Sequence, residues 1–405
     1  MGDPSRVRVS GPLEFYADGF RTRLSDLGYT SIGAVGQLRL MAHVSRWLAG
    51  QRLTVADLDV VGVEEFLAAR RAEGYVQWCS PKAMVVLLEY LHELGVAPVA
   101  VLKPPTGVEA LLSGYRDYLL IERRLAATTA RGYVDMVRPF VEARAATCGG
   151  VPDFVGLSTA DVSRFVLSAC AGRNRGSAKL LVTALRSLLR FLHVTGVIAH
   201  SLVAAVPSVA SWRLVGLPRG LEAGQVRRLL DSCDRRTRLG SRDFAILTLL
   251  ARLGLRRGEV AGLSLDDIDW MAGEIVVRGK GSGRDRLPLP VDVGEAIVDY
   301  LQRGRPADAR GRTVFVRVRA PHRPLTPGGV TAVMIAAGQR CGLGTLTAHR
   351  LRHSIAVDLL RSGAGLTEIG QLLRHRLALT TSIYAKVNYD SLRPLARPWP
   401  SGGVS

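Results

Sequence analysis

Residues 349–354 read His-Arg-Leu-Arg-His-Ser, and the apolar residues Leu351, Ile355 and Leu359 recur at helical spacing through and beyond them. On an α-helix, side chains three or four positions apart lie on the same face, so this apolar stripe can face a core. Positions 349 and 352 then project a histidine and an arginine to one side of the helix. The stretch therefore predicts a helix that presents two prongs of a phosphate clamp.

The residues around this helix predict a mixed segment from residue 221 onward. Two short β-patterned runs at 274–278 and 286–290 flank a glycine-rich turn at 279–283, which indicates a hairpin, and a further short strand is predicted at 313–318. The expected class is α+β, mostly α with a small β-sheet. Helices are expected at 221–233, 243–253, 328–341, 347–361, 366–374 and 379–387.

The first 205 residues predict helices only, in two segments. Proline-containing stretches at 95–107 and 205–220 interrupt the helical patterns, and we interpret both as linkers. The two segments are either divergent copies of one four-helix unit or unrelated units that share apolar stripes. The expected helices cover 20–27, 32–48, 54–70 and 81–94, then 115–121, 128–144, 158–170 and 177–195. The predicted domains are 1–100, 107–205 and 221–390, with a tail at 391–405.

The chain is strongly basic. Its 405 residues include 54 Lys and Arg against 35 Asp and Glu, which gives a formal net charge of +19. This balance favours an anionic partner and argues against an enzyme that acts only on acidic metabolites. Hydrophobic residues make up 47% of the chain and charged residues 22%, which is enough apolar content for folded cores.

The sequence shows no pattern for a membrane or a disulfide framework. It has no apolar run of about 18 residues and no signal-peptide pattern, so we expect a cytoplasmic protein with no membrane partner. Its five cysteines form no C-x-x-C pair, which predicts neither a disulfide framework nor a zinc knuckle.

Lysine is rare in this chain, because only five of the 54 basic residues are lysines. GC-rich coding accounts for the excess of arginine. Lys280 lies in the predicted hairpin turn and is the only lysine between Lys179 and Lys386. A lysine kept there under this bias indicates a role that arginine does not fill.

Two motif-like strings fail on their residue types. Residues 278–282 superficially match a phosphate-binding P-loop, but Glu274 stands where that motif needs glycine and Gly281 where it needs Ser or Thr. His349 and His353 have the spacing of a zinc pair, but the two arginines between them would repel a metal ion. We therefore expect no metal and no cofactor.

What remains is a set of cationic and imidazole side chains, spread over the C-terminal segment and followed by a tyrosine. The predicted catalytic residues, in chain order, are Arg256, Lys280, His349, Arg352, His375 and Tyr384.

This ordered set resembles the tyrosine recombinases, also called phage-type integrases. Residues 254–260, Gly-Leu-Arg-Arg-Gly-Glu-Val, resemble the family motif G-L-R-x-x-E-[LV], and residues 279–281 resemble its G-K-G hairpin. Residues 349–354 resemble H-x-L-R-H-[ST], and residues 372–384 resemble the L-L-G-H…T…Y ending. One motif by itself is a weak signal, whereas the ordered set is specific.

The resemblance covers residues 221–387, and the middle helical segment is similar to the family's core-binding domain with its SAM-like fold. It implies a clamp formed by the core-binding and catalytic domains around duplex DNA, and a tetramer on two paired DNA sites. One residue departs from the family pattern. Arg374 stands where the family usually has glycine, which bears on the local turn geometry.

The chemistry of phosphodiester cleavage explains these residue types. Attack by a phenol builds charge on the non-bridging oxygens, which the guanidinium groups of Arg256 and Arg352 can hold while they stay charged. The leaving 5′ oxygen needs a proton, and the ammonium group of Lys280 can donate one, whereas a guanidinium effectively cannot.

The remaining site residues have less specific chemistry. His349 and His375 can donate hydrogen bonds to the phosphate or assist proton transfer, while His353 is interpreted as a packing residue. Glu259, one helical turn after Arg256, is expected to support that arginine. Tyr384 is the predicted nucleophile, which leaves a 3′-phosphotyrosyl link and a free 5′ hydroxyl.

The middle segment is expected to supply the second DNA-binding surface through its basic residues, because neutralised phosphates release counterions. The alternative for each of them is an ordinary solvated helix face. The predicted DNA-contacting residues are Arg131, Arg173, Arg175, Lys179, Arg186 and Arg190.

These observations predict a recombinase that breaks and rejoins DNA, of the kind that integrates or transposes a mobile element. The alternatives are a chromosome-dimer resolvase, a type IB topoisomerase-like enzyme that relaxes supercoils, and a catalytically inactive DNA-binding accessory protein. The expected partners are double-stranded DNA, further copies of the chain and an accessory recombinase or DNA-bending protein, with the protein at the bacterial nucleoid when bound. The first 100 residues are expected to form either a third DNA-contacting module or a protein-interaction module.

Overall fold

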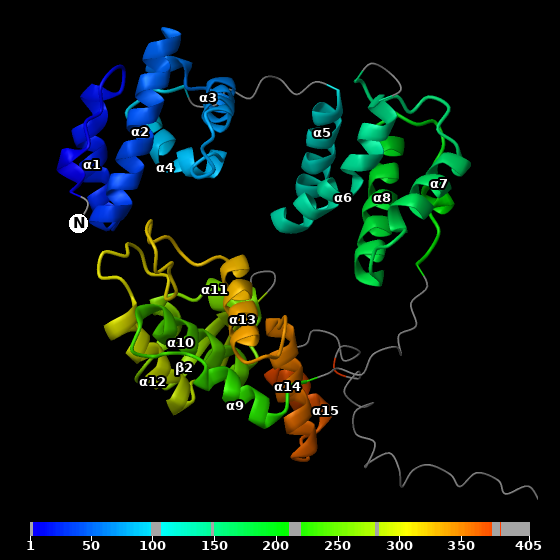
Figure 1. Cartoon of the computed structure of the whole chain (residues 1–405). Helices are drawn as coiled ribbons and strands as arrows, with labels where there is room; N and C mark the ends of the chain where they lie inside the picture. The colour runs from blue at the N-terminus through cyan, green and yellow to red at the C-terminus, as the bar shows by residue number, and fades with distance from the viewer. Residues whose placement is uncertain are drawn as a thin grey trace, which may run out of the picture. The chain divides into compact units, whose positions relative to one another are not determined.

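The computed structural model describes residues 3–98, 107–146, 150–209, 220–279, 283–374 and 381. It is mostly helical with one small sheet, so the expected α+β class is confirmed (Figure 1). The described chain divides into two compact units. Ala100–Arg213 form one unit, and Met1–Val99 with Leu214–Ser405 form the other.

Four helices form the N-terminal part of the chain, and their starts follow from local capping. The side chain of Thr30 accepts a hydrogen bond from the backbone N–H of Gly33, and Asp59 does the same for Gly62. Phe20, Leu38 and Leu87 are fully buried in a core that this part makes for itself. The helices are α1 (Ala17–Asp26), α2 (Ser31–Gln51), α3 (Val60–Ala72) and α4 (Pro81–Glu93), with 3₁₀ turns η1 (Pro4–Arg6), η2 (Glu14–Tyr16) and η3 (Val55–Asp57).

The middle unit also contains four helices. Its core holds Tyr115, whose hydroxyl donates a hydrogen bond to the carbonyl of Ala184 at 3.1 Å and so ties the first helix to the last. Burial raises the pKa of Tyr115 far above its usual value, which fits a structural phenol. The elements are α5 (Val108–Ile121), α6 (Ala127–Ala146), α7 (Thr159–Cys170), α8 (Arg175–Val194) and η4 (Val203–Ala205).

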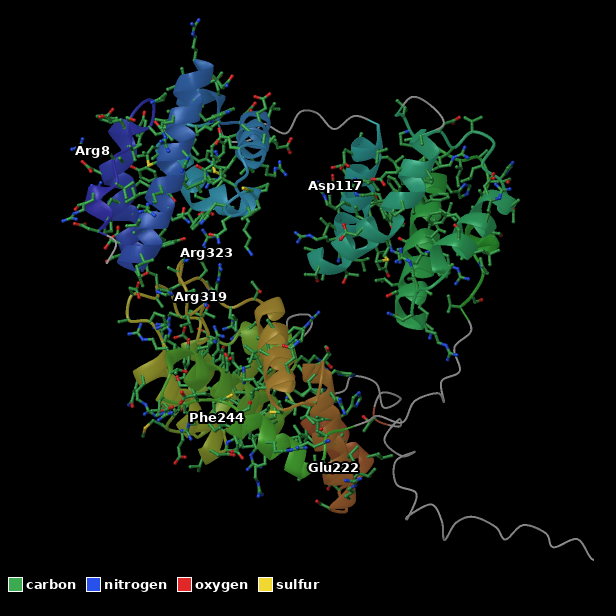
Figure 2. The ribbon with its side chains drawn as sticks, viewed as in Figure 1. Arg8, Asp117, Glu222, Phe244, Arg319 and Arg323 are labelled. Atoms are coloured by element: carbon green, nitrogen blue, oxygen red, sulfur yellow. The ribbon has the colours of Figure 1, made fainter. Side chains whose placement is uncertain are left out.

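The C-terminal part surrounds the long helix α10 and carries the sheet. The three strands pair antiparallel in the order β1-β2-β3, with Glu274 opposite Pro288 and Arg278 opposite Arg284. Figure 2 shows Glu222 and Phe244 in this part, and Arg319 and Arg323 on the loop before α13. The helices are α9 (Ala223–Asp231), α10 (Arg238–Leu253), α11 (Arg257–Ala261), α12 (Val291–Asp299), α13 (Pro327–Arg340), α14 (Ala348–Arg361) and α15 (Leu366–Leu372). The shorter elements are η5 (Leu265–Asp267), the π-helix η6 (Tyr300–Gly304), β1 (Ile268–Asp269), β2 (Glu274–Arg278) and β3 (Arg284–Pro288).

The structure corrects two expected strands. The second hairpin strand covers Arg284–Pro288 instead of 286–290, because the register continues toward the turn as far as Arg284. The strand expected at 313–318 is absent among the described residues, where isolated bridges join Ser264 to Thr313 and Val316 to Pro324. Proline has no N–H for a ladder, so the second pairing cannot extend at that residue.

Several expected features fall outside the described residues. They are the tip of the hairpin turn at 280–282, most of both linkers, and the segment from 375 onward apart from Thr381. Among the helices that the structure describes, none has the length and apolar character needed to cross a membrane.

Candidate active site

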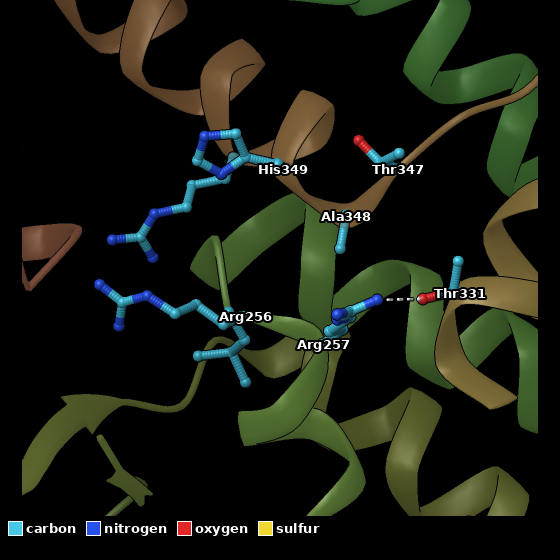
Figure 3. A pocket seen from close by; sticks show the side chains of 8 residues that line it. Arg256, Arg257, Thr331, Thr347, Ala348 and His349 are labelled. Carbon is cyan, nitrogen blue, oxygen red and sulfur yellow. Dashed lines mark hydrogen bonds between the residues drawn. The ribbon is translucent and has the colours of Figure 1, made fainter. Parts of the chain in front are cut away.

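A cavity of about 350 Å³ lies in the C-terminal part, where the start of α11 meets α13 and the first turn of α14. Figure 3 shows Arg256 and His349 reaching into it from different elements, and Arg257 pointing at Thr331. Three arginines and a histidine are among the residues that line the cavity. The lining residues are Leu255, Arg256, Arg257, Thr331, Thr347, Ala348, His349 and Arg352.

Arg352 is held in the interior by the end of α10. Its side chain is 2% exposed, and its Nη1 donates a hydrogen bond to the carbonyl of Gly254 at 2.6 Å. Gly254 ends α10 in the left-handed conformation, with φ of +57°. A Cβ there would lie 3.0 Å from a methyl of Leu373 and 3.2 Å from one of Ile355, so glycine lets these elements approach. The G-L-R motif thus positions Arg352 as well as Arg256.

Arg256 stands at the N-cap of α11, where Glu259 fixes both its backbone and its side chain. The backbone N–H of Arg256 donates to Oε2 of Glu259 at 2.8 Å, and Nη1 donates to Oε1 at 2.6 Å. The Arg256 side chain is 44% exposed, whereas that of Glu259 is 4% exposed. The buried carboxylate therefore orients a guanidinium that still faces the cavity, the supporting role expected for Glu259.

Arg374 provides the second partner of that carboxylate. Its side chain is 6% exposed, and Nη2 donates to Oε2 of Glu259 at 2.7 Å. Its carbonyl accepts a hydrogen bond from Nη2 of Arg256 at 3.3 Å. Its Nε lies 3.8 Å from a carboxylate oxygen of Asp285, on the β2–β3 hairpin that carries Lys280 in its turn. Arg374 thus joins the Arg256 motif, the hairpin and the segment that leads to His375.

Arg374 occupies a backbone conformation that favours glycine. Arg374 adopts φ of +52°, the left-handed region that glycine enters without steric cost. The strain at a non-glycine residue there is of order 1–3 kcal/mol, which the buried ion pair with Glu259 offsets. Sequence analysis identified the departure but missed the contact, because the partner lies 115 residues away.

His349 borders the cavity from the first turn of α14. Burial, followed by the charges of Arg352 and Arg256, lowers its pKa below the usual histidine value. The ring centroids of His349 and His353 lie 4.2 Å apart in an edge-to-face arrangement. Burial and the neighbouring His349 and Arg352 lower the pKa of His353 to about 4. Both imidazoles are therefore neutral near pH 7, and each carries one N–H that can donate.

Arg257 anchors α11 to α13 through a residue that sequence analysis missed. Its Nη1 donates to the hydroxyl of Thr331 at 3.2 Å, along the dashed line in Figure 3. The side chain next to the predicted catalytic arginine thus shapes the cavity wall. The sequence offered no signal for this pairing.

The structure brings together Arg256, His349, Arg352 and Glu259 of the predicted site. Lys280, His375 and Tyr384 lie outside the described residues. The structure does describe the residues next to two of them. Strands β2 and β3 flank the turn that contains Lys280, and Arg374 directly precedes His375 in the sequence.

Basic side chains gather along one face of α8 in the middle unit. At about 100° per residue, positions 175, 179, 186 and 190 fall within about 60° of one another. The buried leucines 181, 185, 188 and 192 occupy the other side of the helix. Arg186 also makes a contact within the unit, since its Nη2 donates to the carbonyl of Val206 at 2.8 Å and holds the segment after η4.

The structure also describes the two other predicted DNA contacts. Arg173 lies two residues before α8 and is exposed, with Nη1 3.7 Å from the sulfur of Met136 on α6. Arg131 is exposed on α6. We refer to Arg175, Lys179 and Arg190 as the α8 basic face.

Comparison with known proteins gives two family matches. Residues 219–391 match the phage integrase family, and residues 112–196 match its N-terminal SAM-like domain. These ranges correspond to the C-terminal part and the middle unit described above.

Two curated relatives match 96% and 70% of the chain. A putative integrase/recombinase y4rA from Sinorhizobium fredii is 40% identical over 96% of this chain and 95% of its own. Tyrosine recombinase XerD from Mycobacterium tuberculosis is 34% identical over 70% of this chain and 94% of its own.

Two solved structures share the fold. The post-cleavage complex of XerH site-specific recombinase on palindromic difH substrate has a TM-score of 0.57 and 17% identity, covering 82% of this chain and 93% of that one. A lambda integrase tetramer bound to a Holliday junction has a TM-score of 0.53 and 18% identity, covering 74% and 85%.

The fold, the cationic cavity and these relatives define a DNA breaking-and-rejoining enzyme of the tyrosine recombinase class. The chain belongs to the phage integrase family, and its activity is site-specific DNA recombination.

The first prediction concerns the carboxylate that positions Arg256. Glu259→Gln removes the charge that two buried or half-buried guanidiniums share, and we expect DNA cleavage to slow by roughly 10- to 100-fold, since a charged hydrogen bond contributes about 1.5–3 kcal/mol. The measurement is the single-turnover cleavage rate. Glu274→Gln is the matched control, because Glu274 pairs with Arg286 at the sheet surface. Equal effects of the two substitutions would contradict the positioning role.

The second prediction concerns pH. His353 titrates near 6.5 when unfolded and at about 4 when folded, so the unfolded state binds more protons in this window. The free energy of unfolding should fall as the pH drops from 6.5 toward 4, most of the loss being present below pH 5. Denaturant titrations at pH 7 and pH 5 test this. His353→Gln should reduce the change in the free energy of unfolding between pH 7 and pH 5. An equal change in that variant would show that other groups cause it.

Proposed function

We propose that this enzyme cleaves DNA by attack of Tyr384 on the scissile phosphate, forming a 3′-phosphotyrosyl bond as the P–O5′ bond breaks. The observation that carries the proposal is the cavity that both Arg256 and Arg352 line, although they are 96 positions apart in the chain. Two guanidiniums offer paired N–H donors to the non-bridging oxygens, whose charge develops in the transition state. His349, neutral and half-buried beside them, adds a further donor.

In this proposal Lys280 protonates the leaving 5′ oxygen, and His375 assists at the phosphate. Both residues are attached to elements that converge on Glu259, because Arg374 lies next to His375 and contacts Asp285 on the hairpin. The phenol of Tyr384 needs its proton removed, which the surrounding cations favour. The covalent bond keeps the energy of the phosphodiester, so attack by a 5′ hydroxyl rejoins the DNA without an added energy source.

We further propose that the biological reaction is integration or transposition of a mobile element. The similarity to the putative integrase/recombinase spans 96% of this chain, whereas that to XerD spans 70%. About three tenths of the chain thus lies outside the XerD match. The competing proposals remain a chromosome-dimer resolvase, as the XerD relative suggests, and a topoisomerase-like enzyme that relaxes DNA without pairing sites.

We propose three functional domains, 1–100, 107–205 and 221–390, followed by a tail at 391–405. Separate hydrophobic cores support this division, since buried residues of the N-terminal, middle and C-terminal parts cluster among themselves. The proposed working assembly is a tetramer on two DNA sites in the cytoplasm, where the nucleoid lies. Its support is the lambda integrase tetramer on a Holliday junction.

The α8 basic face is the proposed DNA contact of the middle domain, together with Arg131 and Arg173. Arg175→Gln with Arg190→Gln should weaken binding of cognate duplex and reduce the slope of log K against log salt by about 2, because each lost phosphate contact removes about 0.9. Arg116→Gln with Arg164→Gln is the matched control, since these arginines lie on α5 and α7 and each pairs with an acidic residue of its own helix. An unchanged slope in the α8 double variant would rule out this face.

The nucleophile is tested on a nicked suicide substrate that carries an element end to which the protein has first been shown to bind. Wild-type protein should form an adduct with DNA that survives SDS, and Tyr384→Phe should form none, because phenylalanine has no nucleophilic oxygen. Tyr389→Phe is the matched control five residues away and should retain the adduct. An adduct in Tyr384→Phe would show that Tyr384 is not the nucleophile. No adduct in the wild-type protein would favour the alternative of a catalytically inactive accessory protein.

A further inference from the structure

A second cavity, of about 410 Å³, lies in the N-terminal part between α2 and α3. No residue that lines it belongs to the predicted catalytic set or to the α8 basic face. The side chains that matter for its chemistry are His43, Arg46 and Trp47 from α2, Arg70 from α3, and Glu73 and Tyr75 after it. The cavity thus combines guanidinium groups with aromatic rings.

Arg70 is a nearly buried arginine that forms no ion pair within the described part of the chain. It is 7% exposed, and its Nε is inaccessible with no hydrogen-bond partner in the described part of the chain. Its guanidinium carbon lies 4.0 Å from the ring centroid of Tyr75. A nearly buried guanidinium with an unsatisfied N–H is costly, so an anionic acceptor within reach of its other N–H groups would stabilise the site.

The remaining charges around the cavity favour an anion over a cation. Arg46 adds a second guanidinium at the exposed rim, 3.2 Å from Nδ1 of His43. Burial, followed by Arg70 and Arg46, lowers the pKa of His43, so this imidazole is neutral near pH 7. Among the described residues that line the cavity, Glu73 is the one carboxylate, and the two arginines outweigh it.

The aromatic rings favour a ligand with a flat apolar part beside its anionic group. Trp47 and Tyr75 both line the cavity, and Tyr75 is 40% exposed. An arginine stacked on a ring keeps its N–H edge directed outward for bidentate contact with phosphate. Rings beside arginines are also the surfaces on which bases stack. A nucleotide has both components, whereas inorganic phosphate or a simple carboxylate has only the first.

We propose that this N-terminal cavity is a nucleotide-phosphate site, in which Arg70 and Arg46 hold a phosphate group and the rings of Trp47 and Tyr75 border the base. The phosphate can come from a free nucleotide or from the backbone of DNA. Both sources offer the phosphate, whereas only a free nucleotide leaves its base open to the rings, so the two sources differ in the titration that responds.

The test uses the full-length protein and three single variants of equal charge change. Arg70→Gln and Arg46→Gln remove the proposed phosphate contacts. Arg39→Gln is the matched control, because Arg39 is exposed on α2 two turns before Arg46 and contacts no described side chain in a hydrogen bond or ion pair. Thermal unfolding identifies any variant that fails to fold. If Arg70→Gln fails to fold, the test rests on Arg46→Gln, because Arg46 is exposed. Calorimetric titrations with deoxyadenosine monophosphate, deoxyadenosine and inorganic phosphate are run beside duplex-binding titrations.

A free-nucleotide source predicts that the monophosphate binds at least ten-fold more tightly than deoxyadenosine or inorganic phosphate, and that Arg46→Gln weakens this binding at least ten-fold while Arg39→Gln does not. A DNA source predicts no monophosphate binding but a fall in duplex affinity for Arg46→Gln that exceeds that for Arg39→Gln by at least three-fold. The proposal is overturned if Arg46→Gln and Arg39→Gln behave alike in both titrations. Cleavage is not measured, so failure here leaves the assignment of Tyr384 untouched.

Discussion

The buried carboxylate of Glu259 is the constraint on which the candidate active site depends. It accepts hydrogen bonds from the guanidinium and backbone of Arg256 and from the guanidinium of Arg374. Removing the carboxylate would leave the nearly buried Arg374 with only the more distant carboxylate of Asp285 as a charge partner, which is unfavourable. Because α11 has only five residues, this network fixes its start more firmly than helix propensity does. Arg256 therefore reaches the cavity already oriented, and phosphate binding need not order it.

Two backbone positions in the left-handed region bring distant segments to this carboxylate. Gly254 ends α10, accepts a hydrogen bond from Arg352 and allows Ile355 and Leu373 to approach. Arg374 ends the turn after α15 in the same conformation. The first position requires glycine for space, and the second tolerates arginine because its side chain gains an ion pair. Local conformation and charge pairing thus determine together where the segment bearing His375 begins.

Periodicity predicted most of the described helices, because their apolar stripes and caps are local, but it missed α12 and placed the start of α10 five residues late. The hairpin was predicted, but the second strand was placed two residues too late in the sequence. Residues 313–318 were wrongly assigned to a strand, because the local sequence pattern does not distinguish a strand from isolated bridges. The short helix α11 was missed because five residues show no period. Motif order predicted that Arg256, His349 and Arg352 would share a site. The contact between Arg374 and Glu259, and that between Arg257 and Thr331, depend on tertiary packing that no window of sequence contains.

The most direct measurement is a double-mutant cycle of Glu259→Gln and Arg374→Gly on the single-turnover rate of DNA cleavage. Glycine fits the positive φ of position 374, so the cycle reports the side-chain contact without new strain. If Glu259 organises the site through both arginines, the two substitutions will be non-additive, with a coupling energy of about 1–3 kcal/mol. The variant with both changes will then cleave little more slowly than Glu259→Gln. Additive effects would contradict the account, because they would mean that the two residues act on catalysis independently.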